Sequence, residues 1–263
     1  MDLGLSGRVA LVGGASRGLG RAIAAELLAE GAHVALVARD AAALERVRAE
    51  LAAGAAGSSH AIPADLAAPG EAARAVSAAR AALGPIDILV TNQGGPPPGP
   101  FESHDADAWR GAYSLLLDSV VEQVRAALPD MKSRGWGRII TVTSIAVKQP
   151  GEGLILSNSL RAGVAGLAKT LAHELAPHGI TVNNVMPGFT RTERLVHLAG
   201  DIARRRGIAP EDAYAEWERH IPLGRLGEPR ELAALVAFLA SARADYITGT
   251  SIPVDGGWIR SLL

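Results

Sequence analysis

A glycine-rich turn near the N-terminus constrains the possible folds of this chain more than any other feature. The short apolar run of residues 9–12 leads directly into Gly-Gly-Ala-Ser-Arg-Gly-Leu-Gly at residues 13–20, and a helical pattern follows. Glycine lets the backbone turn tightly and approach a ligand closely, and free amides at a helix N-terminus bind phosphate. The position between strand and helix therefore predicts a diphosphate-binding turn, with candidate contact residues Gly14, Ser16, Arg17, Gly18, Leu19 and Gly20.

The rest of the chain repeats this alternation of short β-type runs and longer segments rich in Ala and Leu. Such alternation is typical of a parallel sheet covered by helices. The predicted strands are residues 9–12, 34–37, 86–90, 139–142, 181–185 and 251–254, and the predicted helices are 18–30, 41–53, 70–82, 105–132, 157–176 and 229–240. Residues 1–263 show no repeat and no charged linker, so we expect one α/β domain, a Rossmann-type doubly wound parallel sheet. Within it, the irregular segment 188–227 is predicted to be a substrate loop or lid.

Composition and charge exclude several classes of protein. The chain has 26 Lys and Arg against 27 Asp and Glu, and its formal charge of −1 argues against nucleic-acid and membrane-surface binding. It has no cysteine, which excludes disulfides, thiolate metal sites and a cysteine nucleophile. The seven histidines show no metal-ligand spacing, and no apolar stretch approaches the roughly 20 residues of a membrane span. Without a signal segment either, the sequence predicts a cytoplasmic protein that acts on a small molecule and holds no metal.

The end of the second predicted strand bears on the choice of nucleotide. In a dinucleotide fold this strand end meets the adenosine ribose, where an acidic side chain accepts the 2′-hydroxyl of NAD and a guanidinium attracts the 2′-phosphate of NADP. Here Arg39 follows the strand, and Asp40 comes one residue later. Arg17 and Arg39 can together flank a 2′-phosphate, so the sequence favours NADP(H), with NAD(H) as the alternative that Asp40 keeps open.

Several motifs in order resemble those of the short-chain dehydrogenase/reductase family along nearly the whole chain. The glycine turn matches the family's phosphate motif, with Gly13 where Thr is usual. An adenine-contacting Asp, a variant of the Asn-Asn-Ala-Gly segment and a Pro-Gly segment at the nicotinamide also match. They add the predicted cofactor contacts Asp65, Leu66, Asn92, Gly94, Pro187, Gly188 and Thr190. The resemblance, which is to the 3-oxoacyl carrier-protein reductase branch, implies a one-domain Rossmann-type fold, a nicotinamide cofactor and a homodimer or homotetramer.

The resemblance fails at most of the catalytic positions. Family members transfer hydride with a Ser, a Tyr thirteen residues later, a Lys four beyond it and an Asn on the preceding helix. Ser144 fits the first position, but the other three fall on Ser157, Arg161 and Leu116. Tyrosine can protonate an alkoxide because an adjacent cation lowers its pKa from near 10, whereas a serine hydroxyl is a far weaker acid. The sequence therefore predicts an atypical catalytic site.

Roles for the catalytic candidates stay open at this point. On a helix, Ser157 and Arg161 are spaced i, i+4, so Arg161 either hydrogen-bonds the nicotinamide ribose and supplies a fixed positive charge, or forms a structural ion pair. Lys148, four residues after Ser144, is a general-acid candidate if it is partly desolvated, and otherwise a solvent-facing loop residue. Tyr113 either packs or substitutes as the acid.

The function predicted from these features is an NADP(H)-dependent oxidoreductase that interconverts a carbonyl and an alcohol on a small or acyl substrate. The alternative is a non-redox homologue that binds the nucleotide as a structural or regulatory ligand, because Tyr, Lys and Asn are absent from their expected positions. A nucleotide-independent lyase similar to the halohydrin dehalogenases is disfavoured, because those proteins keep the tyrosine and lose the glycine turn.

Overall fold

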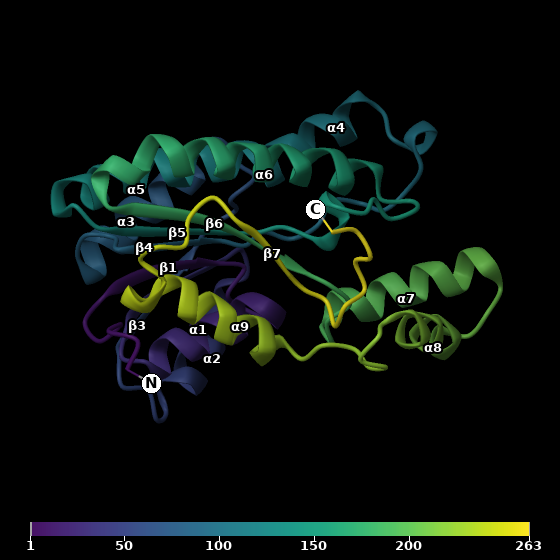
Figure 1. Ribbon diagram of the computed structural model, residues 1–263, viewed down its shortest axis with the longest axis horizontal. Coiled ribbons are helices and arrows are strands. Elements are labelled where there is room, and N and C mark those ends of the chain that lie inside the picture. Colours follow the sequence, from purple (N-terminus) through teal and green to yellow (C-terminus); the bar gives the residue numbers. More distant parts are fainter. Residues whose placement is uncertain (1, 263) are drawn as a thin grey trace.

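The computed structural model describes residues 2–262, which fold around one sheet of seven parallel strands (Figure 1). The strand order is β3-β2-β1-β4-β5-β6-β7. The strands are β1 Val9–Gly13, β2 His33–Ala38, β3 Ser59–Pro63, β4 Ile88–Thr91, β5 Gly137–Val142, β6 Ile180–Pro187 and β7 Ser251–Val254. The central strands β1, β4 and β5 are buried along their whole length, and strands covered on both faces read as continuous apolar runs. The predicted single α/β domain with a Rossmann-type sheet is confirmed.

Helices cover both faces of the sheet. One face carries α1 Gly18–Ala29, α2 Ala41–Ala52 and α9 Pro229–Ala240, and the other carries α3 Glu71–Leu83, α5 Ser119–Arg134 and α6 Ile155–Leu175 (Figure 1). Each helix turns an apolar stripe toward the strands. The stripes of α3 and α9 are rich in alanine, and side chains this small let helix and sheet approach closely. Two separate cores result, one on each side of the sheet.

The structure differs from the predicted elements of the sheet and its helices in two places. The sequence analysis misses β3 because this edge strand is only partly buried and ends in a proline, so it carries no apolar run. The predicted helix 105–132 divides into α4 Ala106–Tyr113, a π turn at Ser114–Asp118 and α5. Ser119, the first residue of α5, donates from Oγ to the carbonyl of Leu115 in the π turn at 2.6 Å. Single π turns of this kind widen a helix locally, and they are frequent at functional sites.

The segment 188–227 contains two helices that the sequence analysis does not predict, α7 Glu193–Arg206 and α8 Pro210–His220. They lie together at one end of the molecule (Figure 1). Leu195, Ile221 and Leu226 form their small buried core, and Phe189 stacks on Trp217 with ring centroids 4.9 Å apart. The segment is therefore a compact helical unit rather than an irregular loop, and its role in holding the substrate stays a prediction.

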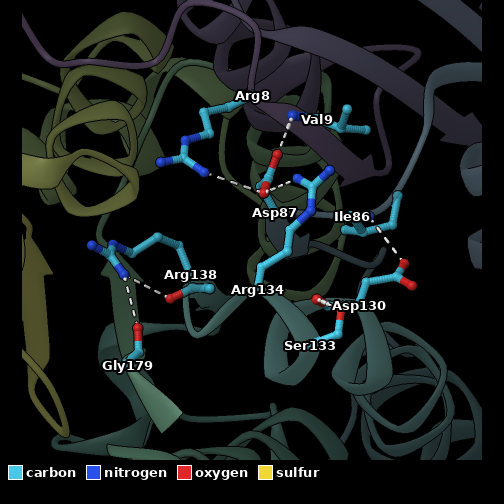
Figure 2. Close-up of polar contacts among 10 residues, drawn as sticks. Arg8, Val9, Ile86, Asp87, Asp130, Ser133, Arg134, Arg138 and Gly179 are labelled. Carbon is cyan, nitrogen blue, oxygen red and sulfur yellow. Dashed lines mark hydrogen bonds and ion pairs between the residues drawn. The ribbon is translucent and has the colours of Figure 1, made fainter.

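A buried carboxylate ties the amino ends of the strands together, at the edge opposite the glycine turn (Figure 2). Asp87 is 1% exposed and accepts a hydrogen bond from the amide of Val9 at 3.0 Å. The guanidinium groups of Arg8 and Arg134 donate to the same carboxylate at 3.4 and 2.6 Å. Since Val9 begins β1 and Asp87 precedes β4, this cluster fixes the two central strands side by side.

We expect Asp87→Asn to lower the free energy of unfolding by about 2 kcal/mol, because the amide cannot satisfy both guanidinium groups and the Val9 amide. Urea unfolding followed by circular dichroism measures the change. Asp107→Asn is the matched control, because Asp107 is 86% exposed and pairs only with Arg110 on its own helix. An Asp87 variant as stable as this control would contradict the structural role.

Within residues 2–262, none of the helices combines the length and the apolar character needed to cross a bilayer. The same residues contain no group of three or more His, Asp or Glu side chains placed to hold a metal ion.

Candidate functional site

The predicted cofactor residues come together at the carboxyl edge of the sheet. β1 lies between β2 and β4, and the helices that follow β1 and β4 cover opposite faces. Ligands of doubly wound sheets bind at such a switch point. Asn92, just beyond β4, donates from Nδ2 to the carbonyl of Gly13 at 3.0 Å, and the amide of Ala15 donates to the carbonyl of Val37 at 3.0 Å. These two bonds hold the glycine turn against both neighbouring strands.

The glycine turn has the shape and the free amides of a phosphate cradle. A Cβ added at Gly20 would lie 2.3 Å from the carbonyl oxygen of Gly14, and one at Gly13 would lie 2.8 Å from the carbonyl oxygen of Asn92. The second contact explains why Gly stands where the family usually has Thr. α1 begins at Gly18 without a side-chain cap, so its first-turn amides are open to an anion. The residues of this turn fit a dinucleotide diphosphate.

The residues predicted to contact the adenosine lie beyond β2 and β3. The carboxylate of Asp40 accepts from the amide of Ala43 at 2.9 Å and so caps α2. Arg39 is exposed, and no ion pair to it occurs within the described residues. Asp65 Oδ1 accepts from the amide of Ala67 at 3.2 Å, and Arg17 forms an exposed ion pair with Glu193 at 2.8 Å. Because Asp40 is occupied and Arg39 is free, this end suits a 2′-phosphate better than a 2′-hydroxyl.

The residues predicted to contact the nicotinamide lie beyond β5 and β6. Ser144, half-buried, follows β5, and its Oγ accepts from the amide of Ala146 at 3.1 Å. Gly188 follows β6 directly. It lies so close to the C-terminal segment that an added Cβ would be 2.7 Å from the Cα of Asp255. Thr190 is buried, and its Oγ1 donates to the carbonyl of Gly188 at 3.3 Å. β5 and β6 pair directly, which places Ser144 and the segment after Pro187 on the same edge.

Arg161 is the central charged group of this end, and it reaches the sheet from α6. Its side chain is 9% exposed, and it donates to the carbonyls of Val142 at 3.1 Å and Gly94 at 3.3 Å. Its Nε donates to Ser157 Oγ at 3.3 Å, one helical turn earlier. Ser157, 8% exposed, accepts this bond, which leaves its own hydroxyl proton available to a ligand. The structure thus brings Arg161 and Ser157 together, as their i, i+4 spacing predicts.

Arg161 has an unusual electrostatic environment. Burial lowers the pKa of Arg161 from its ordinary value to about 10, and the positive charge of Arg194 adds to the effect. Arg194, on α7, donates to the carbonyl of Pro96 at 3.4 Å, and its guanidinium lies where a Cβ on Gly95 would be. Within residues 2–262 neither guanidinium has a carboxylate partner. The sequence analysis misses Arg194, because no local pattern shows that residue 194 reaches the segment after β4.

The other catalytic candidates lie in different surroundings. Lys148 is exposed in the loop after β5. Its backbone amide donates to the carbonyl of Ile145 at 3.0 Å, and no hydrogen bond or ion pair to its Nζ occurs in the described part of the chain. Tyr113 is 47% exposed near the end of α4, and Tyr246 is fully exposed beside Trp136 at the opposite edge of the sheet. Leu116, at the position of the family's Asn, is buried in the π turn. No tyrosine therefore takes the place that Ser157 holds.

Two buried polar atoms beside the site lack partners within residues 2–262. They are Oγ1 of Thr91, the last residue of β4, and Nε2 of Gln93, two residues further on. Both residues are departures from the Asn-Asn-Ala-Gly pattern. Buried polar atoms are rarely left unbonded, so Gln93 Nε2 is a candidate hydrogen-bond donor to a ligand.

Comparisons with known proteins agree with this geometry. Residues 14–259 match the family model described as Enoyl-(Acyl carrier protein) reductase. The 3-oxoacyl-(acyl-carrier-protein) reductase FabG of Salmonella typhimurium is 36% identical over 255 residues, 97% of this chain and 98% of that protein. The NADPH-dependent reductase BacG of Bacillus subtilis is 30% identical over 259 residues, 98% of this chain and all of that one.

Among solved structures, L-sorbose reductase from Gluconobacter frateurii, in complex with NADPH and L-sorbose, superposes with a TM-score of 0.94. It is 32% identical, and the match covers 100% of both chains. The match to the family model spans nearly the whole chain, the reductases in these comparisons share its length, and the fold and glycine turn are those the motifs predicted. The chain therefore belongs to the short-chain dehydrogenase/reductase family, and it is an oxidoreductase.

Proposed function

We propose that the protein interconverts a carbonyl and an alcohol on a small or acyl substrate, with NADP(H) as the hydride carrier. The observation that carries this proposal is the buried Arg161–Ser157 pair, held at the same edge of the sheet as an uncapped, glycine-lined helix N-terminus. The relatives support it, because BacG and the sorbose reductase are both NADPH-dependent.

The choice of NADP(H) follows from the adenosine end of the site. Arg39 is free to bind the 2′-phosphate, whereas the carboxylate of Asp40 already caps α2. Arg17 is held by Glu193 through an exposed ion pair, which is weak enough for Arg17 to turn toward a phosphate. Asn92, Gly94 and the segment 187–190 line the remainder of the crevice. The bound cofactor supplies the hydride.

Arg161 and Ser157 act on the oxygen of the substrate. Hydride addition to a carbonyl leaves negative charge on that oxygen, and a preorganised cation in a buried site stabilises such charge. Arg161 keeps its positive charge at neutral pH, because even its lowered pKa is about 10. The hydroxyl of Ser157 accepts from Arg161 and is free to donate its own proton in a hydrogen bond to the oxygen. Arg161 is also the residue that would hold the nicotinamide ribose when the cofactor is bound.

The proton that completes the alcohol needs a source other than tyrosine. Lys148 and Ser144 are the remaining candidates, because both lie just beyond β5. Ser144 Oγ is anchored to the Ala146 amide, which suits it to orient the substrate. Lys148 is exposed and can deliver a solvent proton.

The missing tyrosine also favours a second candidate function, a protein that binds the nucleotide without redox turnover. The two functions are separated by measuring NADPH binding by calorimetry and NADPH oxidation over a panel of ketones, oxo acids, sugars and acyl thioesters. We expect binding together with turnover, weaker affinity for NADH, and a lower rate in Lys148→Ala. Binding without turnover on the whole panel would exclude the oxidoreductase and leave the second function, and an undiminished rate in Lys148→Ala would remove Lys148.

A further inference from the structure

Two guanidinium groups contact one short segment of the candidate site, and neither is paired with a carboxylate of the described residues. Arg161 donates to the carbonyl of Gly94 from α6, and Arg194 donates to the carbonyl of Pro96 from α7. Most other arginines with ordered partners are matched by a carboxylate, as Arg134 is by Asp87. Within the described residues, two positively charged side chains thus contact the Gly94–Pro96 segment, and the groups that accept their hydrogen bonds there are neutral carbonyls.

This arrangement is electrostatically unfavourable without a ligand. The positive charge of Arg194 lowers the pKa of Arg161, and burial lowers the pKa of both Arg161 and Arg194. The negative charge of Asp201 raises the pKa of Arg194, but the Asp201 carboxylate is ion-paired with Arg204. An anion bound between the two arginines would relieve the repulsion.

Arg194 is the better placed of the two to bind an incoming anion. As a residue it is solvent-exposed, while its guanidinium end packs on the Gly95 peptide. Arg161 is buried, and its donors are already directed at Ser157, Val142 and Gly94. Arginine presents a planar fork that matches a carboxylate with two parallel hydrogen bonds. The glycine at 95 leaves the space that this guanidinium occupies.

We propose that Arg194 binds a carboxylate of the substrate, so that the substrate is an oxo acid in one direction of the reaction and a hydroxy acid in the other. This inference rests on the proposed function, and it narrows the substrate class. Arg161 then supplies the charge at the reacting oxygen, and Arg194 supplies the charge at the acid group. The neighbouring unbonded Gln93 Nε2 is a further donor at the same segment.

The test compares pyruvate, acetoacetate and levulinate, each against its methyl ester, on the wild type and on Arg194→Gln. These acids separate carbonyl and carboxylate by zero, one and two methylene groups, so they sample the distance between the two arginines. NADPH oxidation gives kcat/KM, and calorimetry on the NADPH-loaded protein gives affinity without requiring turnover. We expect the wild type to favour one acid over its ester by at least about tenfold, and Arg194→Gln to lose that preference.

Two variants serve as controls. Arg194→Lys keeps the charge without the fork and should retain part of the preference. Arg219→Gln removes an exposed arginine of α8, which bonds only to a carbonyl of its own helix, and should behave as the wild type.

Three outcomes would overturn the inference. They are equal binding of acids and esters by the wild type, an acid preference that survives in Arg194→Gln, and a fall in NADPH affinity in Arg194→Gln, which would assign Arg194 to the cofactor's phosphates. Failure of the proposed function would give a different result from failure of this inference. Acid binding that depends on Arg194 without NADPH oxidation would support the carboxylate site and exclude the reductase.

Discussion

Arg161→Gln is expected to lower kcat for carbonyl reduction by about a hundredfold, with a much smaller change in NADPH affinity. The side chain is the one buried cation that contacts Ser157, and it joins α6 to the ends of β5 and the segment after β4. Glutamine keeps part of the hydrogen bonding and loses the charge, so the effect on rate reports charge stabilisation at the substrate oxygen. Stopped-flow measurement of NADPH oxidation checks it, alongside circular dichroism to confirm folding.

The matched variant is Arg161→Lys, which keeps the charge and restores the residue that the family resemblance places here. It should retain more activity than Arg161→Gln. Since burial lowers the pKa of Arg161 to about 10, the charged form is complete well below that pH, and the rate should fall as pH rises through about 10. Turnover in Arg161→Gln within about threefold of the wild type would contradict a catalytic charge at this position.

Much of this fold could be predicted from the sequence, and the exceptions have physical causes. Strands β1, β2 and β4 are buried between two helical layers, so their sequences are nearly continuous apolar runs. β5 and β6 are also buried and carry shorter apolar runs beside buried polar residues such as Asn183 and Asn184. β3 lies at the edge and is partly exposed, so it lacks that signal. α7 and α8 bury only a few residues each, such as Leu195 and Ala213, and their remaining positions are mostly charged or exposed. A helix with so little apolar surface resembles a loop in composition.

The candidate site likewise has contacts that follow from the sequence and contacts that do not. The residues predicted to contact the cofactor come together at one edge of the sheet because they follow strand ends, where a motif local in sequence is also local in space. The Arg161–Ser157 contact follows from helical spacing alone. Arg194 could not be predicted, because its contact with Pro96 joins residues 98 positions apart through an unpredicted helix. Asp40 looked available to a ribose, and only the structure shows that its carboxylate caps α2.

Gly20→Ala is expected to weaken NADPH binding by about a hundredfold, since small displacements at a preorganised site cost effects of that size. The φ of Gly20 is not positive, so alanine can adopt this backbone conformation without strain. The variant therefore tests only whether there is room for a Cβ. Its Cβ would lie 2.3 Å from the carbonyl oxygen of Gly14 and 2.8 Å from Nδ2 of Asn92, so the turn or the Asn92–Gly13 bond must move. Calorimetry with NADPH measures the loss.

Gly111→Ala on α4 is the control for this variant, because nothing lies within 4 Å of an added Cβ there. It should leave NADPH affinity unchanged and stabilise its helix by about 0.5–1 kcal/mol, because alanine loses less backbone entropy on folding than glycine. If Gly20→Ala lowered the melting temperature below that of the assay, calorimetry would be repeated on the same variant at a temperature where circular dichroism shows it folded. A folded Gly20→Ala protein that binds NADPH as tightly as the control would show that the cofactor's diphosphate does not lie on this turn, and the assignment of the whole carboxyl edge as a dinucleotide site would fail with it.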